Sequence, residues 1–376
     1  MAALVALLSV GAASDAKQAA VKLPAVKHVF VIMLENESYS ATFGRPADFP
    51  YLAGTLVKRG ALLSNYYATG HSSTDNYLSI VSGQPPNSQS QADCTTFTNF
   101  NGGKVLPDGV ETGPGCVYPT AVKTIGNQLS AAGETWKAYE QDMGNNPHRE
   151  AAACGHPALG QMDGTEEAVP GDGYAAKHDP FVYFHSVIDN SAYCKAHVVA
   201  LGSPTGAMPK AALPGETGLA TDLKKASTTP AFSLITPNLC DDGHDFPCTN
   251  QSSGASPAAD IDSFLQTWVP KITGSPAFKQ GGLLEITFDE AEDADSTACC
   301  GEIAGPGDPP PGGNGPGGGK VGALLISPFI KPGTVSDKPY NHYSSLATWE
   351  LLLGLKRLGY AASVRSTFGA DVFTGS

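Results

Sequence analysis

Residues 26–34, VKHVFVIML, form an almost unbroken apolar run. Such a run is typical of a strand buried on both faces of a parallel sheet, because a strand with one face in water alternates apolar and polar residues. The run ends abruptly in the polar residues Glu35, Asn36, Glu37 and Ser38. We therefore expect a sheet with helices on both faces, and polar side chains at the carboxyl end of this strand.

The rest of the chain alternates between strand-like and helix-like segments. Strands are predicted at residues 61–68, 231–238, 282–288 and 321–327, and helices at about 50–59 and at 120–132, 258–272 and 343–353, with a further helix that begins at Ser73. This order predicts an α/β fold, built as a three-layer sandwich with a mostly parallel central sheet. Residues 305–319, GPGDPPPGGNGPGGG, are too rich in Gly and Pro to pack and are predicted to form a loop.

The chain has 376 residues, a length that one large α/β domain can reach. Residues 1–20 are predicted to be a signal peptide or a disordered N-terminus, because MAALVALLSVGAAS is a short apolar run that ends in small residues. Residues 21–376 would then form a single domain. Weak periodicity near residues 84–119 and 145–214 indicates insertions over the sheet. Few residues follow the last predicted helix, so no additional C-terminal domain is expected.

The charge and the cysteines limit the partners and the compartment. A formal net charge of −13 argues against nucleic-acid binding, because phosphates would be repelled. A metal ion could still allow a small phosphorylated substrate to bind. Eight cysteines and a signal-like start favour disulfides and a secreted or extracytoplasmic location, and no stable membrane insertion is expected. The expected pairs are Cys94 with Cys116, Cys240 with Cys248 and Cys154 with Cys194, while the fate of the adjacent Cys299 and Cys300 stays open, and buried free thiols are the alternative.

Five polar groups lie at expected strand ends or at a helix start, where ligands collect in open α/β sheets. A cap explains hydroxyl residues before a helix, and solvation explains acidic residues in a loop, so each group taken alone has a simpler interpretation. Their coincidence is what favours a site. The groups are Glu35 and Asn36; Ser72, Ser73, Thr74 and Asp75; Asp241, Asp242, His244 and Asp245; Asp289 and Glu290; and Asn341 and His342.

Three kinds of chemistry fit parts of this pattern. A serine esterase would use Ser72 in a nucleophile elbow with Asp289 and His342, although G-x-S-x-G fails at Thr74. A structural zinc site at Cys240, His244 and Cys248 lacks an obvious fourth ligand. A divalent cation held by carboxylate and amide oxygens employs the remaining groups, because it can lower the pKa of a serine hydroxyl and neutralise a phosphoryl group. The helix N-terminus at Ser73 adds N–H groups for an anion.

Five motifs follow one another in order: ENES with Phe43 and Gly44, HSSTDNYLSIVSG, LITPNLCDDGHD, ITFDEAED, and LLISPFIKPG with YNHYSSL. Together, over residues 27–355, they resemble the phosphoesterase family that contains bacterial phospholipases C and acid phosphatases, within the alkaline phosphatase superfamily. The resemblance implies an alkaline-phosphatase-like fold and a divalent metal ion (Mg, Mn, Ca or Zn). It implies metal binding by Glu35, Asn36, Ser73, Asp289 and Glu290, catalysis by Ser73 as nucleophile with His244 and His342, and substrate binding by His71, Asn76 and Asp242.

The expected function is therefore a secreted, metal-dependent hydrolase of phosphoric esters. An acid-phosphatase-like phosphomonoesterase with a serine nucleophile and a small phosphorylated substrate is the first hypothesis. A phospholipase C that acts on phospholipid head groups is the alternative, followed by a metal-independent serine esterase. A binding protein that holds metal or phosphate without turnover is a non-enzymatic alternative, because a fold does not dictate an activity.

Overall fold

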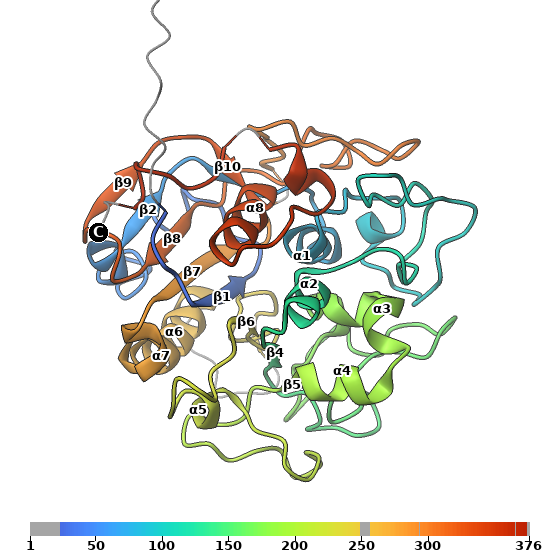
Figure 1. Ribbon diagram of the computed structural model, residues 1–376, viewed down its shortest axis with the longest axis horizontal. Helices are drawn as coiled ribbons and strands as arrows, with labels where there is room; N and C mark the ends of the chain where they lie inside the picture. Colours follow the sequence, from blue (N-terminus) through green and yellow to red (C-terminus); the bar gives the residue numbers. More distant parts are fainter. Residues whose placement is uncertain (1–22, 249–255, 293, 365, 374–376) are drawn as a thin grey trace, which may run out of the picture.

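The computed structural model describes residues 23–248, 256–292, 294–364 and 366–373 (Figure 1). The predicted signal peptide at residues 1–20 lies outside the described residues. In the described part of the chain, no helix is long and apolar enough to cross a membrane.

The core is an eight-stranded sheet with the order β5-β4-β6-β1-β7-β8-β2-β9. The apolar run at residues 26–34 contains β1 (His28–Leu34). This strand lies between β6 (Phe232–Thr236) and β7 (Gly282–Phe288) and is parallel to both. On one side, β4 (Trp136–Glu140) and β5 (Val198–Ala200) continue the parallel arrangement. On the other side, β8 (Ala323–Ile326) is antiparallel to β7 and to β2 (Ala61–Leu63), and β9 (Thr334–Ser336) is parallel to β2. The prediction of a mostly parallel sheet is confirmed.

Helices lie on both sides of this sheet (Figure 1). One side carries α1 (Ser73–Ser82), α2 (Ile125–Ala132) and α8 (His342–Leu352), and the other carries α6 (Pro257–Gly274) and α7 (Pro276–Lys279). Shorter helices are α3 (His185–Ile188), α4 (Ser191–His197) and α5 (Leu219–Asp222), with 3₁₀ turns η1 (Leu56–Arg59), η2 (Ser90–Ala92), η3 (Ala176–His178), η4 (Pro180–Tyr183) and η5 (Gly359–Ala362).

Two predicted elements are wrong. The helix expected at about residues 50–59 is a series of turns that ends in η1, because Gly54, Leu56 and Val57 each donate their main-chain N–H to a carbonyl five residues back and Asp262 accepts the N–H groups of Tyr51 and Leu52. The single strand expected at residues 61–68 is two: β2 joins the large sheet, and β3 (Tyr66–Tyr67) pairs with β10 (Tyr340–Asn341) after a turn.

The Gly- and Pro-rich segment at residues 305–319 contains no helix or strand, as expected, but it does pack. His71 donates its main-chain N–H to the Pro311 carbonyl at 3.2 Å. Gly318 lies so close to Gly70 that a Cβ atom on Gly318 would meet the Gly70 oxygen at 1.7 Å. The glycine at this position therefore allows the loop to lie directly against the segment that precedes α1.

All eight cysteines are paired, each within the described residues. The three expected disulfides, Cys94–Cys116, Cys154–Cys194 and Cys240–Cys248, are present. Cys299 and Cys300, whose fate was open, are bonded to each other. The thiol–His–thiol zinc site is contradicted, because Cys240 and Cys248 are bonded to one another and offer no thiolate.

The strand register brings the polar ends together. Leu34 of β1 lies opposite Phe288 of β7, so that the next residues, Glu35 and Asp289, leave the sheet side by side at its carboxyl edge. The Asp289 main-chain N–H donates to the Leu34 carbonyl at 2.8 Å, which continues the ladder to this point. The edge predicted to collect polar side chains does collect them.

Candidate active site

Four predicted residues from three separate elements meet at this edge. The Ser73 hydroxyl, in the first residue of α1, donates to Oε2 of Glu35 at 3.0 Å. The Asn36 main-chain N–H donates to Oδ1 of Asp289 at 3.0 Å, with Asn36 in a left-handed conformation (φ 55°) that an asparagine tolerates. Glu35 and Asp289 are fully buried, and Ser73 is 3% exposed.

Carboxylates crowd this buried space. Burial raises the pKa of Glu35 well above its usual value, and the nearby charges of Asp289 and Asp242 raise it further. Burial also raises the pKa of Asp289 to about 6. Within the described part of the chain, Oε1 of Glu35 and Oδ2 of Asp289 accept no hydrogen bond, and the contact of Oε1 with Nε2 of His178 at 3.4 Å is an ion-pair distance. Buried carboxylates are normally paired or bound to a metal, so this donor set fits a divalent cation.

His178 faces the same carboxylates from η3. Its Nε2 atom lies 3.4 Å from Oε1 of Glu35, and its Nδ1 atom lies 3.1 Å from Oδ2 of Asp242. Its ring stacks on that of Tyr77, with 5.1 Å between centroids and an interplanar angle of 5°. Burial lowers the pKa of His178 well below its usual value, so the neutral imidazole is favoured and can act as a ligand.

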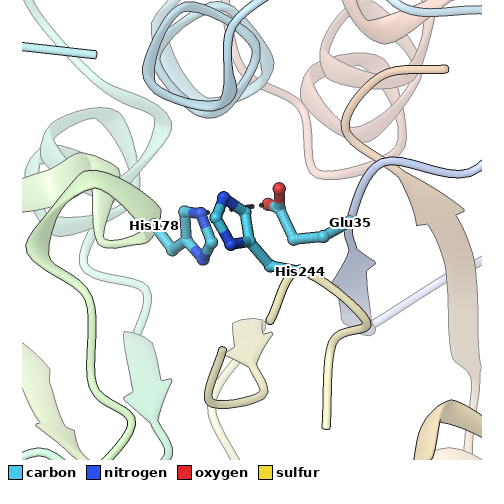
Figure 2. Close-up of side chains that lie close together, drawn as sticks. All are labelled: Glu35, His178 and His244. Atoms are coloured by element: carbon cyan, nitrogen blue, oxygen red, sulfur yellow. Dashed lines mark ion pairs between the residues drawn. The ribbon is translucent and has the colours of Figure 1, made fainter. Parts of the chain in front are cut away.

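Glu35, His178 and His244 form a compact group, with one ligand atom of each within 4.8 Å of the others (Figure 2). Of the five residues predicted to bind metal, only Glu35 belongs to this group. Asp289 adjoins it through the sheet edge, whereas Glu290 points elsewhere, with Oε2 accepting from Nδ2 of Asn76 at 3.1 Å and Oε1 lying 3.4 Å from Nδ1 of His71.

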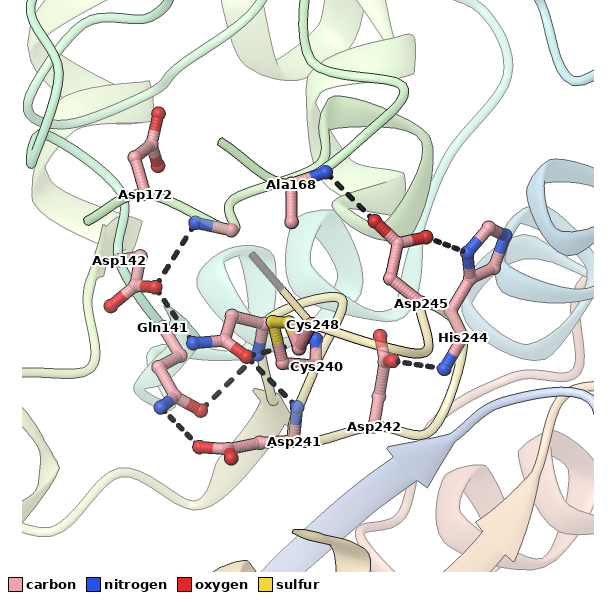
Figure 3. Close-up of a disulfide and its surroundings, with 12 residues drawn as sticks. Gln141, Asp142, Ala168, Asp172, Cys240, Asp241, Asp242, His244, Asp245 and Cys248 are labelled. Carbon is pink, nitrogen blue, oxygen red and sulfur yellow. Dashed lines mark hydrogen bonds and ion pairs between the residues drawn. A yellow bond between two sulfur atoms is a disulfide. The ribbon is translucent and has the colours of Figure 1, made fainter. Parts of the chain in front are cut away.

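The loop after β6 holds both histidines through Asp242. One oxygen of Asp242 contacts His178, and the other accepts the main-chain N–H of His244 at 2.8 Å. The His244 Nδ1 atom lies 2.8 Å from Oδ1 of Asp245, which also accepts the Ala168 N–H through Oδ2 (Figure 3). The Cys240–Cys248 disulfide closes this loop (Figure 3).

Lys177 brings a positive charge to the carboxylates. Its Nζ atom lies 3.1 Å from Nε2 of His244 and 3.7 Å from Oε2 of Glu166. Burial alone would lower the pKa of Lys177, but the nearby carboxylates, Asp93 and Glu35 first, outweigh it and raise the pKa. A lysine ammonium only donates, so Nε2 of His244 accepts and its Nδ1–H donates to Asp245.

The hydroxyls beside Ser73 are arranged differently. The Ser72 hydroxyl faces two main-chain carbonyls, those of His71 at 2.8 Å and Gln91 at 3.0 Å. Thr74 is anchored through its main-chain N–H, which donates to Oδ1 of Asp93 at 3.0 Å. Of the three consecutive hydroxyl residues, Ser73 is the one whose hydroxyl lies on a carboxylate of the site.

Asn76 and His342 contact main-chain groups that carry the site residues. The Asn76 side chain accepts the N–H groups of Thr69 and Gly70, both at 3.0 Å, and donates to the Gly70 carbonyl at 2.8 Å, so it braces the turn before α1. His342 is fully buried, with Nε2 2.7 Å from the Asp289 main-chain oxygen and Nδ1 3.0 Å from the Tyr66 hydroxyl. Burial lowers the pKa of His342 to about 4.

Lys177 and His178 were missed from the sequence because they lie in residues 145–214, which were interpreted as an insertion. That region also supplies β5 to the sheet. A signal was present in AKHDPFVYFH, where a Lys-His-Asp triplet is followed by apolar and aromatic residues. Charged residues next to an apolar segment are buried together with it, and buried charges need partners. Such residues therefore indicate a site.

Comparison with known proteins gives consistent similarities. The model of the Phosphoesterase family matches residues 45–356. The chain is 24% identical to a phosphatidylinositol-3-phosphatase of Mycobacterium tuberculosis, over 94% of this chain and 86% of that protein. It is 26% identical to a phosphate-repressible acid phosphatase of Penicillium chrysogenum, over 87% of this chain but only 59% of that protein, so the chain spans well under two thirds of that relative. Among solved structures, a protein in the alkaline phosphatase superfamily from Vibrio parahaemolyticus superposes with a TM-score of 0.49 and 15% identity, over 88% of this chain and 67% of that one.

Proposed function

This chain belongs to the Phosphoesterase family, and on that premise we propose that it hydrolyses small phosphomonoesters with Ser73 as the nucleophile. The family match confirms the prediction, made from the five motifs, of a phosphoric ester hydrolase. The names of the relatives support a phosphatase, since both the mycobacterial and the fungal protein are described as one.

The contact between Ser73 and Glu35 carries the proposal. In this mechanism the Ser73 oxygen forms a bond to phosphorus while the bond to the leaving-group oxygen breaks, and the serine proton passes to Oε2 of Glu35, 3.0 Å away. Glu35 is the carboxylate that this hydroxyl contacts, and in the metal-free protein burial and neighbouring carboxylates raise its pKa. Water then hydrolyses the phosphoserine, and the proton returns to the serine oxygen.

Glu35, Asn36 and Asp289, with the Ser73 oxygen, would hold a divalent cation, and the buried carboxylate oxygens of Glu35 and Asp289 support this assignment. Glu290, which the sequence also predicted as a ligand, contacts Asn76 and His71 instead. When bound, such a cation would polarise the serine oxygen and neutralise charge on the phosphoryl group. His178 holds Asp242 on one side and faces Glu35 on the other, so it adds either a nitrogen ligand or a fixed contact that orients the carboxylate.

His244 and Lys177 would serve the leaving group. The side chain of His244 is 22% exposed, which makes it the accessible member of the histidine pair. Its Nδ1–H is held by Asp245, and its Nε2 atom lies beside the Lys177 ammonium. A proton delivered from this pair to the departing oxygen would neutralise the charge that develops there.

A secreted or extracytoplasmic location is part of the proposal. Four disulfides support it, because disulfides persist in oxidising compartments.

A substrate panel tests the function. We expect hydrolysis of p-nitrophenyl phosphate, little of bis(p-nitrophenyl) phosphate or p-nitrophenyl acetate, and loss of turnover with a chelator. Acid quenching during turnover should trap phosphate on the tryptic peptide that contains Ser73, and Ser72→Ala should still show it. Cleavage of the acetate in the presence of chelator would instead support the serine esterase.

A further inference from the structure

A second buried carboxyl group lies in the middle of the sheet, away from the candidate site. Glu285 of β7 pairs in register with Val31 of β1 and Leu325 of β8 and is fully buried. Its Oε2 atom accepts from Nε1 of Trp349 at 2.9 Å, and its Oε1 atom lies 2.5 Å from Oγ of Ser345. These partners are neutral, and burial raises the pKa of Glu285 more than their hydrogen bonds lower it.

Glu285 is the first member of a continuous row of short contacts that ends at the site. The Ser345 hydroxyl lies 2.6 Å from the Tyr66 hydroxyl, which lies 3.0 Å from Nδ1 of His342. Nε2 of His342 lies 2.7 Å from the main-chain oxygen of Asp289. Every member of the row is fully buried, so water does not supply protons or acceptors along it.

Counting protons along this row fixes its polarity. The Asp289 carbonyl can only accept, so Nε2 of His342 carries a proton. Ser345 and Tyr66 bring one proton each, and a neutral His342 brings one, which gives three protons for four contacts. The fourth proton must lie on Glu285, or it must convert His342 to an imidazolium opposite a Glu285 carboxylate.

The surroundings favour a proton on Glu285. Glu285 and His342 are both fully buried, and two hydroxyl groups lie between them, so a carboxylate and an imidazolium here would be two separated charges away from water. The neutral acid and the neutral imidazole are therefore preferred together, and burial raises the pKa of Glu285 to about 7. The resulting row is unidirectional, since Glu285 donates to Ser345, Ser345 to Tyr66, Tyr66 to Nδ1 of His342, and Nε2–H of His342 to the Asp289 carbonyl.

We propose that Glu285 is a protonated carboxylic acid that, through Ser345 and Tyr66, holds His342 as an Nε2–H donor to the Asp289 main chain and thereby positions the Asp289 carboxylate. Glu285 is a positioning residue and touches no substrate. The role of Asp289 rests on the proposed function, whereas the proton on Glu285 and the tautomer of His342 do not.

A glutamine distinguishes a protonated from an ionised Glu285. The indole N–H of Trp349 donates only, so the amide oxygen of a glutamine must face Trp349 and its NH₂ must face Ser345, which reproduces the protonated acid. Glu285→Met fills similar space without a donor.

We expect Glu285→Met, Ser345→Ala and Tyr66→Phe each to lower kcat by about tenfold with KM nearly unchanged. A loss of about tenfold is the usual cost of one hydrogen bond. Glu285→Gln should recover most of that loss, and Tyr67→Phe, outside the row, is the control.

Two spectroscopic readouts are independent of activity. The infrared difference spectrum of wild-type protein minus Glu285→Gln should contain the carbonyl band of a protonated carboxylic acid, and nitrogen NMR of His342 should show a proton on Nε2 alone. Absence of the band, or a Glu285→Gln variant as impaired as Glu285→Met, would overturn the proposal. A protein that shows the band but cleaves no phosphate ester would contradict the proposed function and leave the protonated Glu285 supported.

Discussion

The hydroxyl of Ser73 lies 3.0 Å from the carboxylate of Glu35, although 38 positions separate the two residues in the chain. The contact depends on two features of the fold. The strand β1 ends at Leu34 and delivers Glu35 to the sheet edge, and α1 begins at Ser73 with its N-terminal turn facing that edge. A hydroxyl at a helix N-terminus beside a carboxylate suits an in-line attack on an anionic phosphoryl group, the role proposed for Ser73.

Replacing Ser73 by alanine should remove nearly all turnover. The variant lacks the attacking oxygen, so we expect kcat to fall by about 10⁴-fold or more while the melting temperature stays close to that of the wild type. Ser72→Ala is the matched control, because the Ser72 hydroxyl faces main-chain carbonyls rather than the site. If Ser72→Ala were the inactive variant and Ser73→Ala the active one, the nucleophile assignment would be reversed.

The stability of the metal-free protein should fall as the pH rises from about 4 to about 6. The folded protein raises the pKa of Asp289 from 3.8 to about 6, so the folded state holds this proton more tightly than the unfolded state. Stability from this group is therefore present below pH 3.8 and is lost as the pH passes through 6. A shift of about two units corresponds to roughly 3 kcal/mol at most.

Asp289→Asn tests this linkage directly. Chemical denaturation of chelator-treated protein across pH 4–7 should show a shallower pH dependence for the variant than for the wild type. A divalent cation should raise the stability of the wild type near neutral pH and raise that of Asp289→Asn much less. Identical pH profiles for the two proteins would exclude a raised pKa at Asp289.

The sequence predicted the central strands well because burial on two faces leaves a strong apolar signal. The strand predicted at residues 282–288 coincides with β7, and the first strand is correct within two residues. The strands β4, β5 and β9 were not predicted. They are short or, in WKAYE, mix apolar with polar residues, and a three-residue strand such as β5 has too few residues for a periodic signal.

The carboxylates of the site and His244 could be located from sequence, but His178 could not. Glu35 and Asp289 each follow a strongly apolar strand, so their meeting at one edge follows from parallel pairing. His178 comes from a 3₁₀ turn in a segment without periodicity, and its approach to Glu35 depends on how that segment packs across the sheet edge. The sequence also could not show that both nitrogens of His342 are engaged away from Ser73.

His178→Ala should lower kcat by about 10- to 100-fold, the usual cost of losing a residue that orients or completes a metal site. The change removes the contacts with Glu35 and Asp242 at once. It should also weaken the activation of chelated protein by added divalent cation. His185→Ala is the control, because His185 contacts Asp189 and Asn99 instead. Equal activity of the two variants would remove His178 from the site.

Loss of the Cys240–Cys248 disulfide should harm activity more than its contribution to stability suggests. The bond closes a loop with a sequence separation of 8, for which loop entropy gives about 2–3 kcal/mol. The same loop carries Asp242 and His244, so its relaxation would move both (Figure 3). We expect the Cys240→Ser, Cys248→Ser double variant to stay folded at 25 °C but to lose kcat. The Cys154→Ser, Cys194→Ser pair should lower stability with less effect on kcat, and equal kcat losses in the two pairs would argue against a local effect on the site.

Small phosphomonoesters should be cleaved in preference to phospholipids. The reacting groups are deeply placed, since Glu35 and Asp289 are fully buried and Ser73 is only 3% exposed, so a compact phosphate on a small leaving group reaches them more easily than a head group still embedded in a bilayer. The formal net charge of −13 would also repel anionic lipid surfaces. We expect kcat/KM for p-nitrophenyl phosphate to exceed that for dispersed phosphatidylcholine, each at its best pH, and the difference to widen when anionic lipid is added to the vesicles.

Bis(p-nitrophenyl) phosphate is the control that separates the type of bond from the presentation of the substrate in a lipid surface, because it is a soluble diester. Poor cleavage of both diesters would identify a monoesterase, whereas rapid cleavage of phosphatidylcholine would favour the phospholipase C and leave the assignment of Ser73 intact.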